Sequence, residues 1–326
     1  MPLPALLANR LRLPAMAAPQ FLVSGPDLVV ETCRAGLVGT FPSLNQRSTE
    51  GYAAWLDEIA TRLAALPHAA PFGVNLIVHR TNVRLEADLA ATVQARVPIV
   101  ITSLGANTEV IDAVHSYGGL VFHDVINRRH AEKAAEAGVD GIIAVCAGAG
   151  GHAGTLSPFA LVSEVRQVFA GTIILAGAIG TGAHILAAQA MGADLAYLGT
   201  RFIATQESLA ADAHKHMIVA GRAADIIHTP AISGVAGNFL RPSLVAQGLD
   251  PDNLPSGKTM DMSRRQGADE GRAWRDIFSA GQGIGAIDDV PTVAELCDRL
   301  AAEYQAALVG LGQGVPAAAA AAKLPA

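Results

Sequence analysis

Short apolar runs alternate with longer segments of helical spacing along most of the chain. Eight such runs occupy residues 13–17, 37–41, 72–78, 98–103, 119–125, 141–146, 172–177 and 195–200. Each is followed by a small or polar residue and then by a segment whose apolar positions recur with helical periodicity. Strands that are apolar on both faces and alternate with helices are typical of parallel βαβ units.

The number of these units favours a closed barrel. Eight strand and helix repeats are the count that closes a (β/α)8 TIM barrel. The joints at residues 136–145 and 190–199 also share one pattern, in which Gly138 or Gly192 ends a helix and an Asp precedes the next strand. We therefore predict an α/β fold, a TIM barrel, with a doubly wound sheet as the alternative.

The alternation of apolar runs and helical segments stops after the eighth run. This change of pattern divides the chain into regions. We expect residues 1–205 to form the barrel and residues 206–275 to form an inserted, mostly helical lid segment over its C-terminal mouth. Residues 276–312 then return to the barrel, with Thr292 as the N-cap of a closing helix over 290–308. The alanine-rich residues 313–326 read as a low-complexity tail.

Composition narrows the class of protein. The chain is 51% hydrophobic and 16% charged with a net charge of −6, and its scattered Lys and Arg offer no basic stripe for nucleic acid. No run approaches the roughly 18 apolar residues of a membrane span. Cys33, Cys146 and Cys297 have neither disulfide-framework nor metal-site spacing. We expect a cytoplasmic globular protein that needs no metal.

Glycines follow the seventh and eighth strands. Residues 177–182 read GAIGTG, and Gly199 and Thr200 end the next unit. In barrels these two loops commonly hold a phosphate, because backbone N–H groups approach an anion where side chains are absent. The alternative is that the glycines only permit tight turns. The order of the glycines and the lack of a following acidic residue disfavour a dinucleotide-binding fingerprint.

His152 stands among Gly148, Gly150, Gly151 and Gly154 at the end of the sixth strand. An imidazole titrates near neutrality and removes a proton from carbon when the substrate lies within hydrogen-bond reach. The surrounding glycines would provide that room. A structural histidine is the alternative, and we interpret the other histidines in that way.

Several motifs together resemble one known family. PFGVNL, AGGHAG, AGAIGTG, GADLAYLGTRF, NFLRPS and SAGQGIG look like those of the class I nitronate monooxygenases, FMN-dependent barrels formerly called 2-nitropropane dioxygenases. The resemblance covers residues 13–310, although single motifs also occur in FMN-dependent enoyl reductases and quinone reductases.

The resemblance implies a site for FMN and a role for each matching residue. His152 corresponds to the family's base. The positions that correspond to flavin contacts are Ala18, Pro19, Gln20, Asn75, Gly150, Gly177, Ala178, Gly199, Thr200 and Gln282. Two positions depart from several relatives: Asp124 stands where they carry a lysine near the flavin pyrimidine, and Val145 where they carry a glutamine. Asp124 either contacts the flavin or caps a helix or pairs with Arg128 or Arg129.

The implied reaction is FMN-dependent oxidation of an alkyl nitronate or nitroalkane by O₂ to a carbonyl compound and nitrite. The implied partners are this small substrate and O₂, with no nucleic acid or membrane, and a homodimer is left open. The first alternative is an NAD(P)H-dependent reductase of an enoyl thioester or quinone on the same scaffold. The second is a flavin-free barrel that binds a phosphorylated metabolite.

Overall fold

Eight parallel strands form a barrel in the computed structural model, which describes residues 3–255 and 274–313. The strands are β1 (Ala15–Ala17), β2 (Gly39–Pro42), β3 (Phe72–Ile77), β4 (Ile99–Ser103), β5 (Leu120–Val125), β6 (Gly141–Val145), β8 (Thr172–Ala176) and β9 (Leu195–Leu198). Strand β1 pairs with β9, and a parallel bridge from Met16 to Val38 joins it to β2. The barrel prediction is confirmed, and the doubly wound alternative fails because the first strand has neighbours on both sides.

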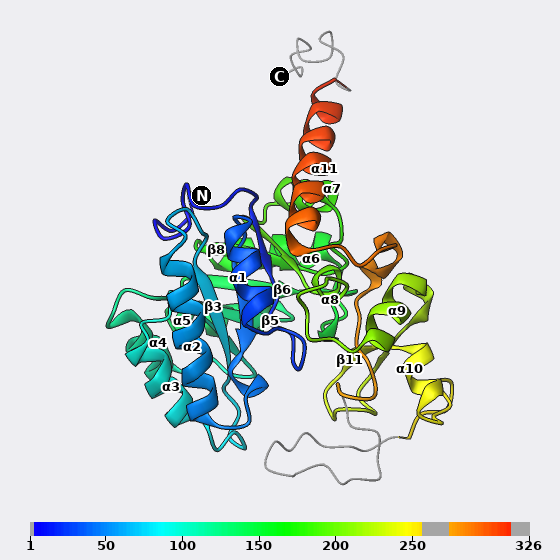
Figure 1. The fold of residues 1–326 in the computed structure, drawn as a ribbon, viewed down its shortest axis with the longest axis horizontal. Coiled ribbons are helices and arrows are strands. Elements are labelled where there is room, and N and C mark those ends of the chain that lie inside the picture. The colour runs from blue at the N-terminus through cyan, green and yellow to red at the C-terminus, as the bar shows by residue number, and fades with distance from the viewer. Residues whose placement is uncertain (1–2, 256–273, 314–326) are drawn as a thin grey trace.

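Helices cover the outside of this barrel, as Figure 1 shows. They are α1 (Pro26–Arg34), α2 (Thr49–Ala64), α3 (Leu85–Gln94), α4 (Thr108–His115), α5 (Arg128–Glu136), α6 (Pro158–Val168), α7 (Gly182–Ala190) and α11 (Val293–Gln313). Side chains of Ser48, Asn107, Asn127 and Thr181 accept backbone N–H groups at four of their N-termini. Such caps satisfy donors that have no partner within the helix.

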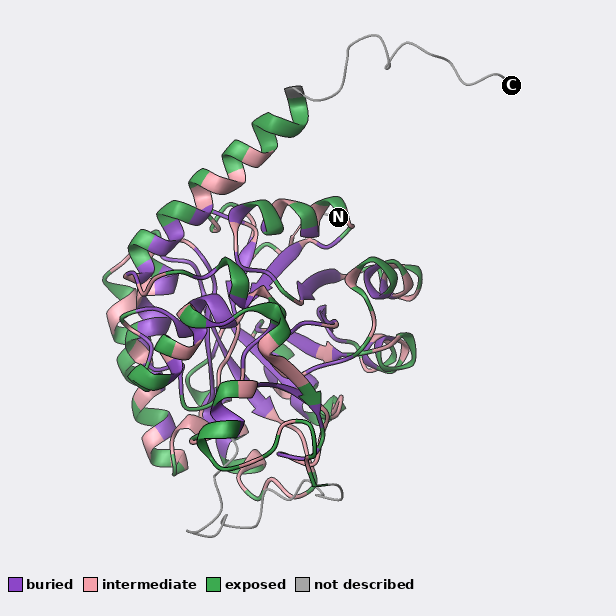
Figure 2. Cartoon of the chain, turned by 90° about the vertical axis from the view of Figure 1, so that its right-hand side faces the viewer, coloured by how far each residue is buried: buried purple, intermediate pink, exposed green. Residues whose placement is uncertain are grey.

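The strands are apolar on both faces because each face packs against something. Ile99 and Ile101 belong to the cluster inside the barrel, whereas Val100 between them packs under the outer helices. Leu7 from the N-terminal segment is also part of the inner cluster. In Figure 2 the strands are accordingly buried, while the outer sides of the helices are exposed.

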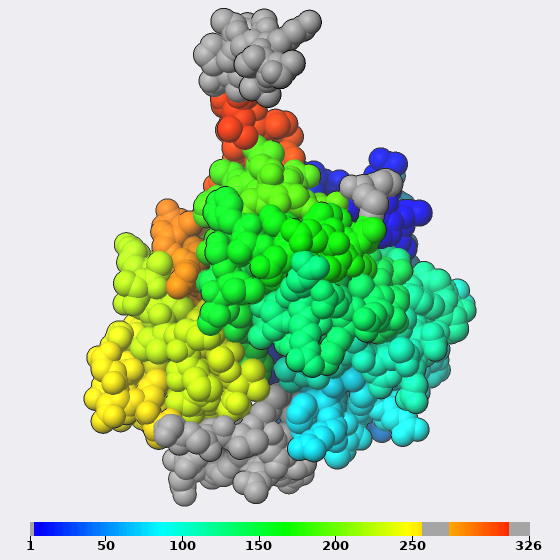
Figure 3. Space-filling view, turned by 180° about the vertical axis from the view of Figure 1, so that it is seen from behind, coloured from blue at the N-terminus to red at the C-terminus, as the bar shows by residue number. Residues whose placement is uncertain are grey.

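The insertion after the eighth strand lies beside the barrel, in yellow-green and yellow in Figure 3. It follows the short helix α8 (Thr200–Ile203) and contains α9 (Asp212–Ala220), β10 (Ile226–Thr229), β11 (Gly237–Leu240) and α10 (Arg241–Ala246). Strand β11 pairs antiparallel with both β10 and β7 (Gly151–His152). We predicted helices and loops here, and the strand pair is an addition. Its strands have four residues each, too few to show a period.

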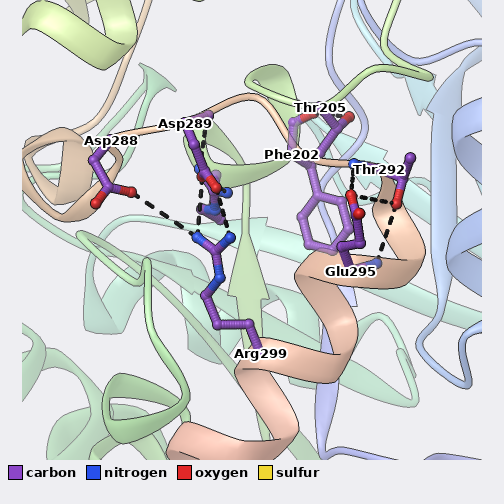
Figure 4. A network of polar contacts seen from close by, with 8 residues as sticks. Phe202, Thr205, Asp288, Asp289, Thr292, Glu295 and Arg299 are labelled. Atoms are coloured by element: carbon purple, nitrogen blue, oxygen red, sulfur yellow. Dashed lines mark hydrogen bonds and ion pairs between the residues drawn. The ribbon is translucent and has the colours of Figure 1, made fainter.

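An ion pair between a buried arginine and a partly exposed aspartate attaches the returning chain to the barrel. Arg201, which is 2% exposed, donates to Asp289 at 2.9 Å. Arg299 of α11 donates to both carboxylate oxygens of Asp289 (Figure 4). Thr292 and Glu295 then form a reciprocal capping pair at the start of α11, which confirms Thr292 as its N-cap. The return segment is therefore held at Asp289 by two arginines and at Thr292 by the cap of α11.

Three further expectations concern cysteines, metals and membranes. All three cysteines are buried and free. The described residues contain no group of three His, Cys, Asp or Glu side chains suited to a metal. None of the helices in residues 3–255 and 274–313 is long and apolar enough to cross a bilayer.

Removing the Asp289 carboxylate should destabilise the protein markedly. Asp289→Ala leaves the buried Arg201 cation without a carboxylate, so we expect the free energy of unfolding to fall by about 2–4 kcal/mol. Asp288→Ala is the matched control, because Asp288 is 90% exposed and lies 3.9 Å from Arg299. We expect it to cost less than about 0.5 kcal/mol. Urea unfolding of both variants measures the difference, and equal losses would contradict this account.

Candidate functional site

A cavity of about 2020 Å³ opens at the C-terminal ends of the barrel strands. Its wall takes residues from the loops after all eight barrel strands, from the insertion and from the return segment. Of the predicted site residues, the wall includes His152, Ala18, Pro19, Gln20, Asn75, Asp124, Gly150, Gly177, Ala178, Gly199 and Thr200. Gln282 is outside the wall, and its backbone N–H donates to the Gly148 carbonyl at 2.8 Å.

Backbone strain is concentrated in this wall. Six described residues other than glycine have a positive φ, and four of them line the cavity: Leu22 at 62°, Leu104 at 65°, Ala178 at 54° and Trp274 at 74°. Side chains disfavour this left-handed region, and residues held there cluster at binding and catalytic sites. The strain marks the cavity as the functional region of the barrel.

Two glycines after β8 and β9 form a cradle of bare backbone, which is tightly packed at Gly177 and open at Gly199. Gly177 has a φ of 150°, and a Cβ there would lie 3.0 Å from the Ala147 carbonyl oxygen. A Cβ on Gly199 would meet nothing closer than 3.7 Å. The backbone N–H groups of Gly177, Gly199 and Thr200 have no hydrogen-bond partner among the described residues. Unpaired donors on side-chain-free backbone suit an anionic group such as a phosphate.

His152 lies in the cavity wall with one ring nitrogen engaged. Its Nε2 lies 3.0 Å from the Ser233 hydroxyl, which itself donates to the Val235 carbonyl at 3.0 Å. Nε2 must therefore carry the proton, which leaves the Nδ1 lone pair as the acceptor. Nδ1 has no partner among the described residues. Burial lowers the pKa of His152 to about 4, so the ring is neutral at pH 7.

Aromatic and backbone contacts fix the loop that carries His152. The Trp274 ring meets the imidazole edge-on, with ring centroids 5.2 Å apart. The Gly151 N–H donates to the Ser279 hydroxyl at 2.7 Å, and that hydroxyl donates to the Asn238 carbonyl. His214 Nε2 donates to the Ser279 carbonyl at 2.9 Å, which agrees with a structural role for this buried histidine.

Asp124 faces the cavity rather than a helix end. Asn127 caps α5, and Arg128 pairs with Glu132, so the predicted alternative of a cap or an arginine partner is wrong. The Asp124 carboxylate accepts from the Ser103 hydroxyl at 2.5 Å, and that hydroxyl accepts from Asn75 at 2.7 Å. Burial raises the pKa of Asp124 to about 6.

Two buried polar atoms in the wall have no protein partner among the described residues. They are Gln20 Oε1 and the Tyr197 hydroxyl. A buried polar atom without a hydrogen bond costs about 1–3 kcal/mol. The Gln20 side chain lies beside the glycine cradle, 3.7 Å from a Cβ built on Gly199, whereas the Tyr197 hydroxyl lies in the part of the wall that also contains Asp124. Unsatisfied polar atoms at two places in one wall suit a ligand with several polar groups.

Some of these residues carried no clear signal in the sequence. Ser103 and Tyr197 stand at or near the carboxyl ends of strands, where barrel sites form, and that position could have singled them out. Ser233 and Trp274 belong to the insertion, and they reach His152 only through the fold. Sequence spacing gives no indication of such contacts.

A family model and curated relatives match this chain. Residues 80–303 match the model described as nitronate monooxygenase. A methyl-oxo-octahydro-indene-carboxyl-CoA dehydrogenase of Rhodococcus jostii is 26% identical over 332 residues, covering 89% of this chain and 92% of the relative. A nitronate monooxygenase of Paraburkholderia phytofirmans is 28% identical over 287 residues, covering 73% and 76%.

Solved structures share the fold. FabK from Thermotoga maritima aligns with a TM-score of 0.77 at 23% identity, covering 94% of this chain and 97% of that one. A nitroalkane oxidase from Streptomyces ansochromogenes aligns with a TM-score of 0.80 at 24% identity, covering 94% and 100%. At this identity the likeness concerns the barrel architecture.

Replacing Asp124 should change the pH dependence of stability. A folded-state pKa of about 6 exceeds the unfolded value of about 3.9, so the stability from the protonated carboxyl is complete below pH 4 and is lost as pH rises through 6. Asp124→Asn should therefore match the wild type at pH 4 and exceed it at pH 7.5 by about 1–3 kcal/mol. Thermal unfolding across this range measures the difference.

Asp112→Asn on the exposed surface of α4 is the control for a simple change of charge. An equal pH-dependent gain in both variants would contradict a specific effect of the cavity on Asp124.

Proposed function

The chain belongs to the nitronate monooxygenase family, and from this premise we propose that it oxidises alkyl nitronates with O₂, using FMN, to a carbonyl compound and nitrite. Membership makes it a flavin-dependent oxidoreductase. The identity of the flavin and of the substrate is the proposal. It rests above all on one observation, the neutral His152 whose free Nδ1 belongs to the wall of the cavity.

We assign the cofactor contacts from the donors and acceptors present. Gly177, Gly199 and Thr200 would hold the phosphate through their backbone N–H groups. Gln20 and Tyr197 would pair their unsatisfied polar atoms with the body of the flavin. Bound FMN would supply the electron acceptor, while the protein supplies orientation and proton handling.

Asp124 and Asn75 would approach the polar edge of the flavin from the other side of the cavity. The hydrogen bonds from Asn75 to Ser103 and from Ser103 to Asp124 fix both side chains in place. A carboxyl with a pKa of about 6 acts as donor or acceptor near neutral pH. This property distinguishes Asp124 from a lysine, which only donates.

His152 would handle the substrate proton. A neutral nitroalkane must lose a proton from carbon before it is oxidised, and the unpartnered Nδ1 is the acceptor that the wall offers. The hydrogen bond from Nε2 to Ser233 fixes the orientation and the tautomer of the ring. Because burial lowers the pKa of the ring to about 4, His152 is unprotonated at all pH values above about 5.

A second candidate is oxidation or reduction of an acyl thioester with the same cofactor. The cavity volume of about 2020 Å³ supports it, because this is larger than the common range of about 300–1,000 Å³ for ligand pockets. The cavity therefore has room for a large acyl thioester as well as the cofactor. The similarity to the CoA-thioester dehydrogenase of Rhodococcus jostii extends over most of the chain. Anaerobic mixing distinguishes the candidates, because rapid bleaching of the flavin by NADPH favours a reductase and bleaching by a nitronate favours the oxidase.

Gly199→Glu should abolish retention of FMN. Gly199 has space for a side chain and a negative φ, so the substitution adds a carboxylate to the cradle without backbone strain. That carboxylate repels a phosphate of about −2 charge. Gly285→Glu, at an exposed glycine outside the cavity, is the control and should retain FMN. The ratio of flavin to protein absorbance measures the result, and stoichiometric FMN in Gly199→Glu removes the phosphate assignment.

His152→Asn should slow turnover of neutral nitroalkanes by about 10²–10⁴-fold, the usual contribution of a general base. Nitronates have already lost the proton, so their oxidation should change much less, and FMN should remain bound. Stopped-flow reduction by both forms of one substrate measures the contrast. His68→Asn, at an exposed histidine outside the cavity, is the control. Small, equal losses for both substrate forms would make His152 a structural residue.

A further inference from the structure

The mouth of the cavity carries cations that nothing in the described protein neutralises. Arg47 follows β2, Arg80 follows β3, and Lys133 lies on α5 after β5. None of these three side chains has an ion pair or a hydrogen bond with a described residue. Ten described arginines do form ion pairs. Of the four described Lys and Arg side chains that form neither an ion pair nor a hydrogen bond, three line this cavity, and Arg129 is the fourth.

The described residues of the cavity wall provide little negative charge to neutralise these cations. Among the described wall residues Asp124 is the only carboxylate, and it is committed to the Ser103 hydroxyl. His130 lies three residues before Lys133, so the two side chains share one face of α5, and both line the cavity. A cleft lined by one sign of charge concentrates ligands of the opposite sign. The mouth is thus suited to a strongly anionic ligand.

Exposed apolar side chains lie in the same wall. Of the large hydrophobic side chains that are exposed in the described chain, Phe21, Leu22, Leu104 and Ile126 line this cavity, each 37–41% exposed. Leu22 and Leu104 also have a strained positive φ. Exposed apolar groups in a concave surface commonly contact a ligand.

We propose that this rim is a second ligand subsite, which binds the polyphosphate tail of a nucleotide-linked substrate or cosubstrate. Arg47, Arg80 and Lys133 would contact the phosphates, and the apolar side chains would cover the arm that leads inward. The cradle at Gly177 and Gly199 follows β8 and β9, whereas the rim follows β2, β3 and β5. Two anionic groups therefore have separate places in one cavity.

The volume of the cavity agrees with two ligands. About 2020 Å³ is twice the upper end of the common range for one ligand, so space remains beside a flavin. The inference depends on the cavity being the ligand site of the proposed function, but not on nitronate chemistry. Two ligands share the required chemistry: a coenzyme A thioester and a dinucleotide reductant both carry a pyrophosphate.

Binding of coenzyme A and of NADPH to the full-length, FMN-loaded protein tests the subsite. We expect one of them to bind, and Arg47→Ala, Arg80→Ala and Lys133→Ala each to weaken its Kd about 3- to 10-fold. Raising ionic strength from about 0.05 to about 0.5 M should weaken binding further. Isothermal titration calorimetry measures both effects, and the bound probe identifies whether the rim takes the thioester carrier or the reductant.

Arg129→Ala is the matched control. The exposed Arg129 side chain on α5 has no ion pair or hydrogen bond to a described residue, and it is outside the cavity wall. The inference is overturned if neither probe binds, or if Arg129→Ala weakens binding as much as the rim variants do. Flavin absorbance is read separately, so failure to retain FMN counts against the proposed function and not against the rim.

Discussion

The site depends on the close approach of two stretches of backbone that have almost no side chains. A Cβ on Gly281 would lie 2.5 Å from the Gly148 oxygen and 2.8 Å from the Gly150 nitrogen. The same contact brings the Gly281 N–H within 2.7 Å of the Thr200 hydroxyl. Any larger residue at position 281 would separate the loop after β6 from the return segment. The glycines therefore bring the two loops together as well as making room for a ligand.

The position of His152 follows from this contact. The insertion leaves the barrel after α8 and comes back through Ser279, whose hydroxyl ties the Gly151 N–H to the Asn238 carbonyl. Once β11 is fixed beside β7, Ser233 lies within hydrogen-bond distance of the imidazole. The insertion thus acts on the proposed base mainly by orienting it. Without these contacts, the conformational freedom of the glycines would let the His152 ring adopt many orientations.

The sequence predicted the barrel well because its information is local and repeated. Runs such as 141–146 and 172–177 are apolar on both faces, and each contains one strand of the barrel. The glycines after β8 and β9 do lie in the cavity wall, while the binding of a phosphate there stays a prediction. The pair β10 and β11 could not be predicted, since four residues are too few to show a strand period and the pairing of β11 with the two-residue β7 arises only in the folded chain. The contacts of Trp274 and Ser233 with His152 also arise only from tertiary structure.

Under the proposed function, Asp124 would have to do near the flavin what the lysine of the resembling enzymes does there, and it would do so through different physics. A lysine beside a flavin would balance developing negative charge with a permanent cation. The Asp124 carboxyl, whose pKa burial raises to about 6, would instead balance such charge in the proposed complex by taking up a proton. Negative charge nearby raises that pKa further, so protonation and charge development reinforce each other. The hydrogen bonds through Ser103 to Asn75 keep the carboxyl in position in either state, because a hydroxyl both donates and accepts.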